Sequence, residues 1–222
     1  MDSNLLCGST RVRMTVTFEP WKPLSNDPRF AGRRLLIVGE SHYDEGQTYA
    51  PEQIRTFTTD IVRTWGAEAK GHQRFFANIF RTLNEQSADH TSEAFRSFWH
   101  SVFFYNYVQS FVHGGARVRP TAKMFAESAD AFHAVLTDVR PEAVLVMGQT
   151  TWDQMSERGA VLVDHDEDGL GSIWRYQFEG GTCLAAHTHH PSSNGYAPDY
   201  WRARVLRFLE RPIGCSAPKT SA

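Results

Sequence analysis

The chain has 222 residues, of which 41% are hydrophobic and 13% aromatic, so it can bury one substantial core. Its formal net charge of −2 argues against a protein that coats nucleic acid, because nonspecific DNA binding depends on Lys and Arg neutralising phosphates. The first thirty residues lack the pattern of a signal peptide, and no apolar run approaches the ~20 residues that cross a bilayer. We therefore expect a cytoplasmic protein without membrane contact, acting as a monomer.

The cysteines are odd in number and far apart, at Cys7, Cys183 and Cys215. This pattern fits neither a disulfide framework nor the paired spacing of zinc or iron–sulfur ligands. We expect reduced thiols and no cofactor.

The domain is expected to span residues 31–211. Residues 1–30 contain several prolines and are predicted to form an irregular N-terminal arm, and residues 212–222 a flexible tail. Four short apolar runs within the domain are typical of buried parallel strands. These predicted strands are 33–39, 103–108, 140–148 and 180–187.

Helical periodicity occupies the segments between the strands, at 76–83, 125–136 and 200–209. Strands that alternate with helices predict a three-layer α/β/α fold with a central, mostly parallel four-stranded sheet. Ligands of such sheets bind at the loops that leave the carboxyl ends of the strands. We therefore expect a site where the loops after Gly39, around Asn106 and after His187 meet.

The loop after the first predicted strand crowds acids, a hydroxyl, an imidazole and a phenol into consecutive positions. Such density indicates a site, although a polar turn in which Ser41 or Asp44 caps a helix is an equal alternative on these residues alone. The residues are Glu40, Ser41, His42, Tyr43 and Asp44.

The last loop contains His187, His189 and His190, followed by Pro191 and small polar residues. A single histidine would usually be structural, but three within four residues favour a site. They are too close together for the usual zinc spacings and no paired cysteines accompany them, so we expect no metal.

Asn106 interrupts an aromatic and apolar run that should be buried. A buried amide needs several hydrogen-bond partners. Asn106 is therefore either a core residue satisfied by neighbouring backbone or a residue that reads a ligand.

Taken in order, these motifs resemble the uracil-DNA glycosylase superfamily over residues 33–209. The first loop is similar to the superfamily's Gly-Gln-Asp-Pro-Tyr or Gly-Glu-Ala-Pro-Gly loop, Asn106 to its buried Asn, and 190–192 to its late His-Pro-Ser loop. The segment 78–83 resembles the Asn-Ile-Tyr-Lys-Glu-Leu helix start. The resemblance implies the superfamily's fold and excision of uracil, or another deaminated base, from DNA.

The resemblance also implies how the base is held. Such enzymes flip the nucleotide out of the stack, place the base on an aromatic ring and read its edge. Asn106 would donate to O4 and accept from N3–H of uracil, Tyr43 would exclude the methyl group of thymine, and Phe57 would be the stacking ring, with Phe75 or Phe76 as less favoured candidates. Ser192 and Ser193 would contact the substrate.

Cleavage leaves negative charge on the departing base, and His190 would stabilise it by donating to O2. The residue that matches the superfamily's water-positioning Asp or Asn is Ser41, which is the main departure from the pattern. Glu40, His42 or Asp44 would then orient the water. The position of the superfamily's apolar wedge holds Asn194, so Tyr196 or Gly195 would serve, or the wedge is weak.

Two other functions compete with this one. Loss of the usual Asp allows a damaged-DNA binding module that does not cut. A serine hydrolase that uses Ser41 is less favoured, because the loop lacks the second Gly of a nucleophile elbow.

Overall fold

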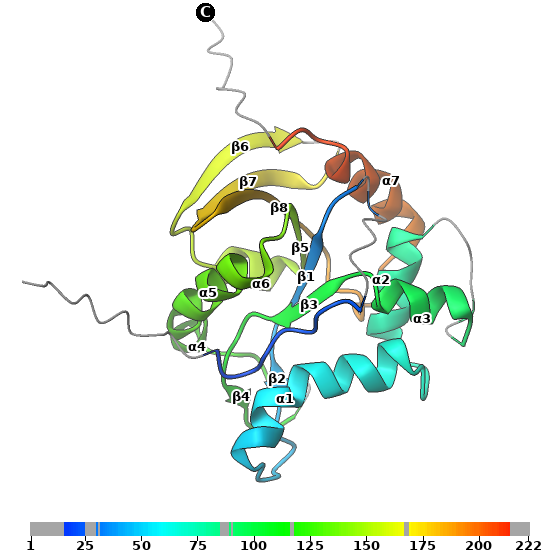
Figure 1. Ribbon diagram of the computed structural model, residues 1–222, viewed down its shortest axis with the longest axis vertical. Helices are drawn as coiled ribbons and strands as arrows, with labels where there is room; N and C mark the ends of the chain where they lie inside the picture. Colours follow the sequence, from blue (N-terminus) through cyan, green and yellow to red (C-terminus); the bar gives the residue numbers. More distant parts are fainter. Residues whose placement is uncertain are drawn as a thin grey trace, which may run out of the picture.

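Six strands form one mixed sheet in the computed structural model, which describes residues 16–24, 30, 32–84, 89, 91–115, 118–166 and 169–213 (Figure 1). The strand order is β3-β1-β5-β8-β7-β6. The first four strands are parallel: β3 (Phe103–Asn106), β1 (Leu35–Gly39), β5 (Ala143–Met147) and β8 (Gly181–Thr188). Two antiparallel strands, β7 (Gly171–Phe178) and β6 (Ala160–Asp166), extend the sheet.

The prediction of an α/β fold with a mostly parallel sheet is confirmed, and the four predicted runs are its four parallel strands. The prediction of only four strands is wrong. β1 and β5 are buried along their whole length, which gives each the continuous apolar run of a covered parallel strand. The outermost strand, β6, instead exposes Val161 and Leu162 to about half their area, and a half-exposed edge strand gives no such run.

Helices cover both faces of the sheet. Leu35 and Ile37 of β1 face one apolar cluster, and Leu36 and Val38 face the other. The first cluster is completed by α1 (Pro51–Val62) with the π-helical turn Arg63–Ala67, α2 (Arg74–Leu83), α3 (Glu93–Trp99) and α7 (Pro198–Leu209); the second by α4 (Ala122–Glu127), α5 (Ala129–Val139) and α6 (Gln149–Gln154).

The sheet register brings the predicted loops to one edge. Gly39, the last residue of β1, pairs with Asn106, the last residue of β3, and Met147 at the end of β5 pairs with Thr188 at the end of β8. Beyond this edge the chain forms a small parallel pair, β2 (His42–Tyr43) with β4 (Phe111–Val112). The loops after β1, β3, β5 and β8 therefore surround one region.

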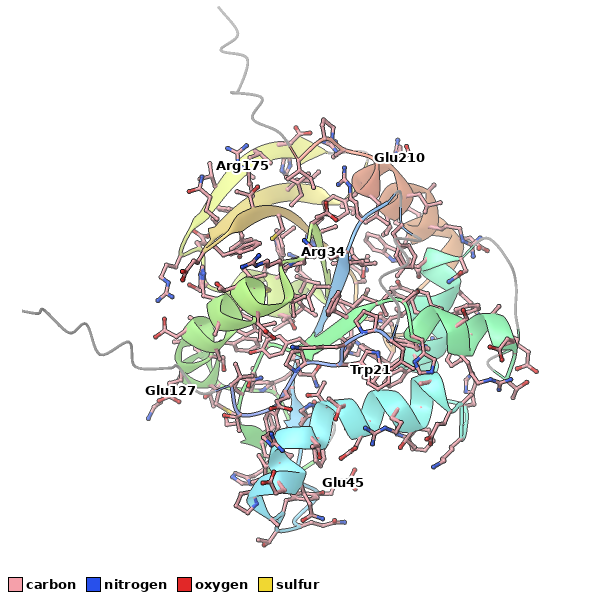
Figure 2. The ribbon with its side chains drawn as sticks, viewed as in Figure 1. Trp21, Arg34, Glu45, Glu127, Arg175 and Glu210 are labelled. Carbon is pink, nitrogen blue, oxygen red and sulfur yellow. The ribbon has the colours of Figure 1, made fainter. Side chains whose placement is uncertain are left out.

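Part of the segment predicted as an arm packs on the domain. Phe18 and Trp21 are buried, and Trp21 exchanges backbone hydrogen bonds with Phe104 of β3 (Figure 2). The indole nitrogen of Trp21 also donates to the carbonyl of Trp99 (2.7 Å). Residues 1–15 and most of the predicted tail, 214–222, lie outside the described residues. Within the described part, no helix has the length and apolar character needed to span a membrane.

Candidate functional site

A cavity of about 270 Å³ opens among the loops at the carboxyl ends of β1, β5 and β8. Pockets for drug-sized ligands measure about 300–1,000 Å³, so this cavity suits a group as small as one heterocyclic base. Two other cavities, of about 180 and 190 Å³, are lined by residues away from these strand ends. The cavity is lined by Glu40, Arg119, Gly148, Gln149, Thr150, His189, His190, Ser193 and Asn194.

His190 is held as a neutral hydrogen-bond donor at the cavity wall. Its Nδ1 accepts from the backbone N–H of Ser192 (3.2 Å), so the proton of the neutral ring resides on Nε2. Burial and, to a lesser extent, the positive charge of Arg119 lower the pKa of His190 below its usual value. Near neutral pH, the imidazole therefore presents an N–H without carrying a charge.

The loop that carries His190 is anchored to α2. Asn78 donates to the carbonyl of Pro191 (2.7 Å), and Arg74 donates to the carbonyl of Ser193 (3.1 Å). The backbone N–H of Ser193 closes a turn onto the carbonyl of His190 (2.9 Å). The segment that resembles the superfamily's helix start thus fixes the His-Pro-Ser loop against the sheet.

Glu40 is a buried carboxylate on the same cavity. Its Oε2 accepts from Nη1 of Arg119 (2.9 Å) and from the hydroxyl of Thr151 (3.4 Å). Arg119 itself is mostly exposed, with 64% of its side chain accessible. Glu40 and His190 are the two candidate catalytic residues that line the cavity together.

Ser41 and Asp44 have different surroundings. The hydroxyl of Ser41 is buried and has no hydrogen-bond partner among the described residues. Asp44 accepts from the backbone N–H of Gly46 (3.1 Å) and is hydrogen-bonded to His113; these two contacts, in that order, lower the pKa of its carboxyl. Neither residue lines the cavity.

Asn106 lies across Gly39 and is bonded to the first loop. Its Nδ2 donates to the carbonyl of Ser41 (3.0 Å) and to the ring of His42, where Nδ1 lies at 3.2 Å and Nε2 at 3.3 Å, so both amide hydrogens are engaged. Its Oδ1 turns toward Gly39, where an added Cβ would lie only 2.2 Å from it. Position 39 therefore requires glycine, because any side chain there would collide with the amide of Asn106.

His42 is buried and uncharged. Its Nε2 is hydrogen-bonded to the hydroxyl of Thr58 (2.7 Å), and both ring nitrogens lie within 3.3 Å of Nδ2 of Asn106. Burial lowers the pKa of His42 to about 3. His42 therefore orients Asn106. The next residue, Tyr43, is half-buried.

Phe57, the expected stacking ring, lies on α1 inside an aromatic group. Its ring is 4.9 Å from His42 and from Phe111, and 5.1 Å from Tyr49. Phe75 of α2, a less favoured candidate for that ring in the sequence analysis, lies 5.3 Å from the ring of His190. Sequence periodicity could not separate the two, because both rings lie on amphipathic helices.

The three histidines of the last loop have three different environments. The ring of His187 stacks on Trp152 (5.0 Å), where burial lowers its pKa to about 4, and that of His189 lies 4.9 Å from Trp201. His190 contacts Phe75. The described residues contain no group of three or more His, Cys, Asp or Glu side chains placed to hold a metal ion.

Sequence reasoning missed the contacts that Arg119 and Thr151 make with Glu40. Both contact Glu40 from positions 79 and 111 residues away, and no local pattern announces such contacts. No protein-family model matches the chain, and no curated protein matches it.

Proposed function

We propose that this chain is a DNA glycosylase of the uracil-DNA glycosylase superfamily, which flips uracil or another deaminated base and hydrolyses its N-glycosidic bond. The observation that carries the proposal is His190, a neutral imidazole whose Nε2 proton is available at a base-sized cavity. A neutral donor suits a leaving group that becomes an anion, because the interaction strengthens as charge develops in the transition state.

Glu40 is the residue that we assign to the water. It is the acid that shares the cavity with His190, and its contacts with Arg119 and Thr151 hold the carboxylate in place. Water attacks C1′ of the flipped nucleotide and gives its proton to Glu40, while the bond from C1′ to the base breaks and the base leaves with the electron pair, stabilised by His190. Ser41 then needs no role as a base.

Phe75 replaces Phe57 as the proposed stacking ring. It contacts His190 and lies 6.0 Å from Phe104, whose ring tip is beside Gly39 and the Oδ1 of Asn106. Phe75, Asn106 and His190 thus lie at the same end of the sheet, although of the three only His190 is among the residues that line the cavity. Tyr43 keeps its proposed role against C5 of the base.

Asn106 presents an acceptor rather than a donor. Both of its amide hydrogens are engaged by Ser41 and His42, so Oδ1 is left to accept from a base N–H. Uracil offers N3–H, and hypoxanthine and xanthine offer N1–H. The proposed substrate class is therefore deaminated bases with a ring N–H beside a carbonyl.

The serine hydrolase alternative has little support. A nucleophilic Ser needs a base in hydrogen-bond contact. The hydroxyl of Ser41 has no partner in the described structure, and the nearest imidazole in sequence, His42, is bonded to Thr58 and Asn106. A binding module without activity remains the second candidate, and only an activity measurement separates it from the glycosylase.

The proposal is tested by incubating purified protein with end-labelled oligonucleotides that contain uracil, hypoxanthine or xanthine, followed by alkali cleavage, with and without EDTA. We expect cleavage at one or more of these bases, unaffected by EDTA. If none of these oligonucleotides is cleaved, the chain is the binding module and not a glycosylase. If EDTA abolishes the activity and zinc restores it, the mechanism depends on a metal ion.

A further inference from the structure

A basic face lies next to the cavity. The helices α2 and α7 pack against each other (Figure 1), and the guanidinium of Arg202 donates to the carbonyl of Arg81 (3.0 Å) across their contact. Together they carry five arginines and one acid, Asp199, which gives +5 − 1 = +4, against −2 for the whole chain. The arginines are Arg74, Arg81, Arg202, Arg204 and Arg207.

A row of rings connects this face to the cavity. His189 lines the cavity, its ring lies 4.9 Å from Trp201, and the ring of Trp201 lies 5.1 Å from Tyr200. Tyr200 is 52% exposed, and the guanidinium of Arg204 lies 3.6 Å from its ring centre. An exposed ring paired with a cation is a surface on which an unpaired base can stack.

The tip of the loop between β8 and α7 offers nothing to open a duplex. Between Pro191 and Tyr196 its exposed residues are Ser192, Asn194 and Gly195, and nearer its two ends the loop also exposes His189 and Ala197. Tyr196, the aromatic candidate for a wedge, is buried, and its hydroxyl is hydrogen-bonded to that of Thr82 (2.9 Å). Flipping a base out of a duplex costs a few kcal/mol of unstacking and unpairing, and a single strand avoids most of that cost.

We propose that the basic face, formed by α2, α7 and the loop 189–196, binds single-stranded DNA, with one unpaired base stacked on Tyr200 and phosphates paired with exposed arginines such as Arg74 and Arg81. The identification of the strand as DNA rests on the proposed function. The charge contrast favours a nucleic acid, and the exposed ring and the polar loop tip favour a single strand over a duplex.

The test is a titration of the protein with a fluorescein-labelled single-stranded oligonucleotide of mixed sequence, free of damaged bases, and with the corresponding duplex, followed by fluorescence anisotropy. We expect tighter binding of the single strand. Tyr200→Ala should weaken that binding roughly 5- to 150-fold, the range for loss of one stacked base, whereas Tyr200→Phe should retain it.

The contribution of the arginine charges is tested with the same single-stranded oligonucleotide. Arg74→Ala should weaken binding and reduce the slope of log Kd against log salt by about 0.7, the value for one phosphate contact of a single strand. Lys123→Ala is the matched control, because Lys123 is an exposed cation on α4, on the other side of the molecule (Figure 1). It should bind as the unmodified chain does.

Equal or tighter binding of the duplex, or a Tyr200→Ala variant that binds like the unmodified chain, would overturn the proposal. These measurements use undamaged DNA and need no base excision. Failure of the glycosylase proposal would therefore leave the binding result standing, and failure of binding to the basic face would leave excision at the cavity to be judged separately.

Discussion

Glu40 and Asp44 are both buried acids of one loop, but their partners differ. Glu40 lines the cavity and is held by Arg119 and Thr151, whereas Asp44 is held by the backbone of Gly46 and by His113 outside it. A carboxylate that orients water must reach the reacting atom in addition to being ionised. At the level of single residues, position therefore distinguishes the two acids.

This difference leads to a comparison of two isosteric variants. Glu40→Gln removes the charge from the cavity and should lower the single-turnover rate of uracil excision about 10²–10⁴-fold, the usual contribution of a general base. Asp44→Asn should cost less. A larger loss for Asp44→Asn than for Glu40→Gln would contradict the assignment of Glu40.

The pairing of β1 with β3 at their carboxyl ends depends on the glycine at position 39, which has no side chain. Gly39 and Asn106 are paired residues at the ends of these strands, and an alanine Cβ at position 39 would lie 2.2 Å from Oδ1 of Asn106 and 3.1 Å from the ring of Phe104. Gly39→Ala must therefore displace Asn106. We expect a loss of about 1–3 kcal/mol in the free energy of unfolding, measured by urea denaturation.

A double variant separates crowding from other effects. Asn106→Ala removes the atom that a Cβ at position 39 would strike, so Gly39→Ala should cost less in the Asn106→Ala background than in the unmodified chain. An equal cost in both backgrounds would show that Asn106 does not fill the space above Gly39.

The elements that sequence could predict are those with a continuous pattern. Leu35–Gly39 contains only apolar residues before its final glycine, and Ala143–Met147 is apolar throughout. Both faces of each strand are covered, so neither strand has a polar side. β6 and β7 form an antiparallel hairpin at the sheet edge, and their mixture of polar and apolar residues does not indicate a strand as clearly.

The positions of the candidate residues were predictable to the same extent. The locations of His190, Glu40 and Asn106 could be predicted because each lies at, or within two residues of, the end of a recognisable strand. The contact of Phe75 with His190 could not be predicted, because it joins positions 115 residues apart.

The stability of the whole molecule should fall in acid because two histidines, one buried and one half-buried, are uncharged in the folded chain. The pKa of His42 is lowered to about 3 and that of His187 to about 4, against an ordinary histidine pKa of 6.5. Below pH 6.5 the unfolded chain binds protons that the folded chain does not, so the free energy of unfolding decreases as the pH falls toward 4. Each histidine contributes at most about 1.4 kcal/mol per pH unit.

His42→Gln should reduce the slope of this dependence between pH 6.5 and 4, measured by urea denaturation at several pH values. His165→Gln is the control, because His165 is an exposed histidine on β6, and its slope should match that of the unmodified chain. An unchanged slope in His42→Gln would mean that His42 is protonated in the folded protein.

The most direct test of the account is the single-turnover rate of uracil release from DNA by His190→Ala and Ser41→Ala. His190 is proposed to act mainly in the transition state, so His190→Ala should lower the rate about 10²–10³-fold with little loss of affinity for the substrate. Ser41→Ala should cost far less, since the hydroxyl of Ser41 has no partner in the described structure. A His190→Ala variant near the unmodified rate, together with an inactive Ser41→Ala variant, would contradict the account and move the chemistry to Ser41.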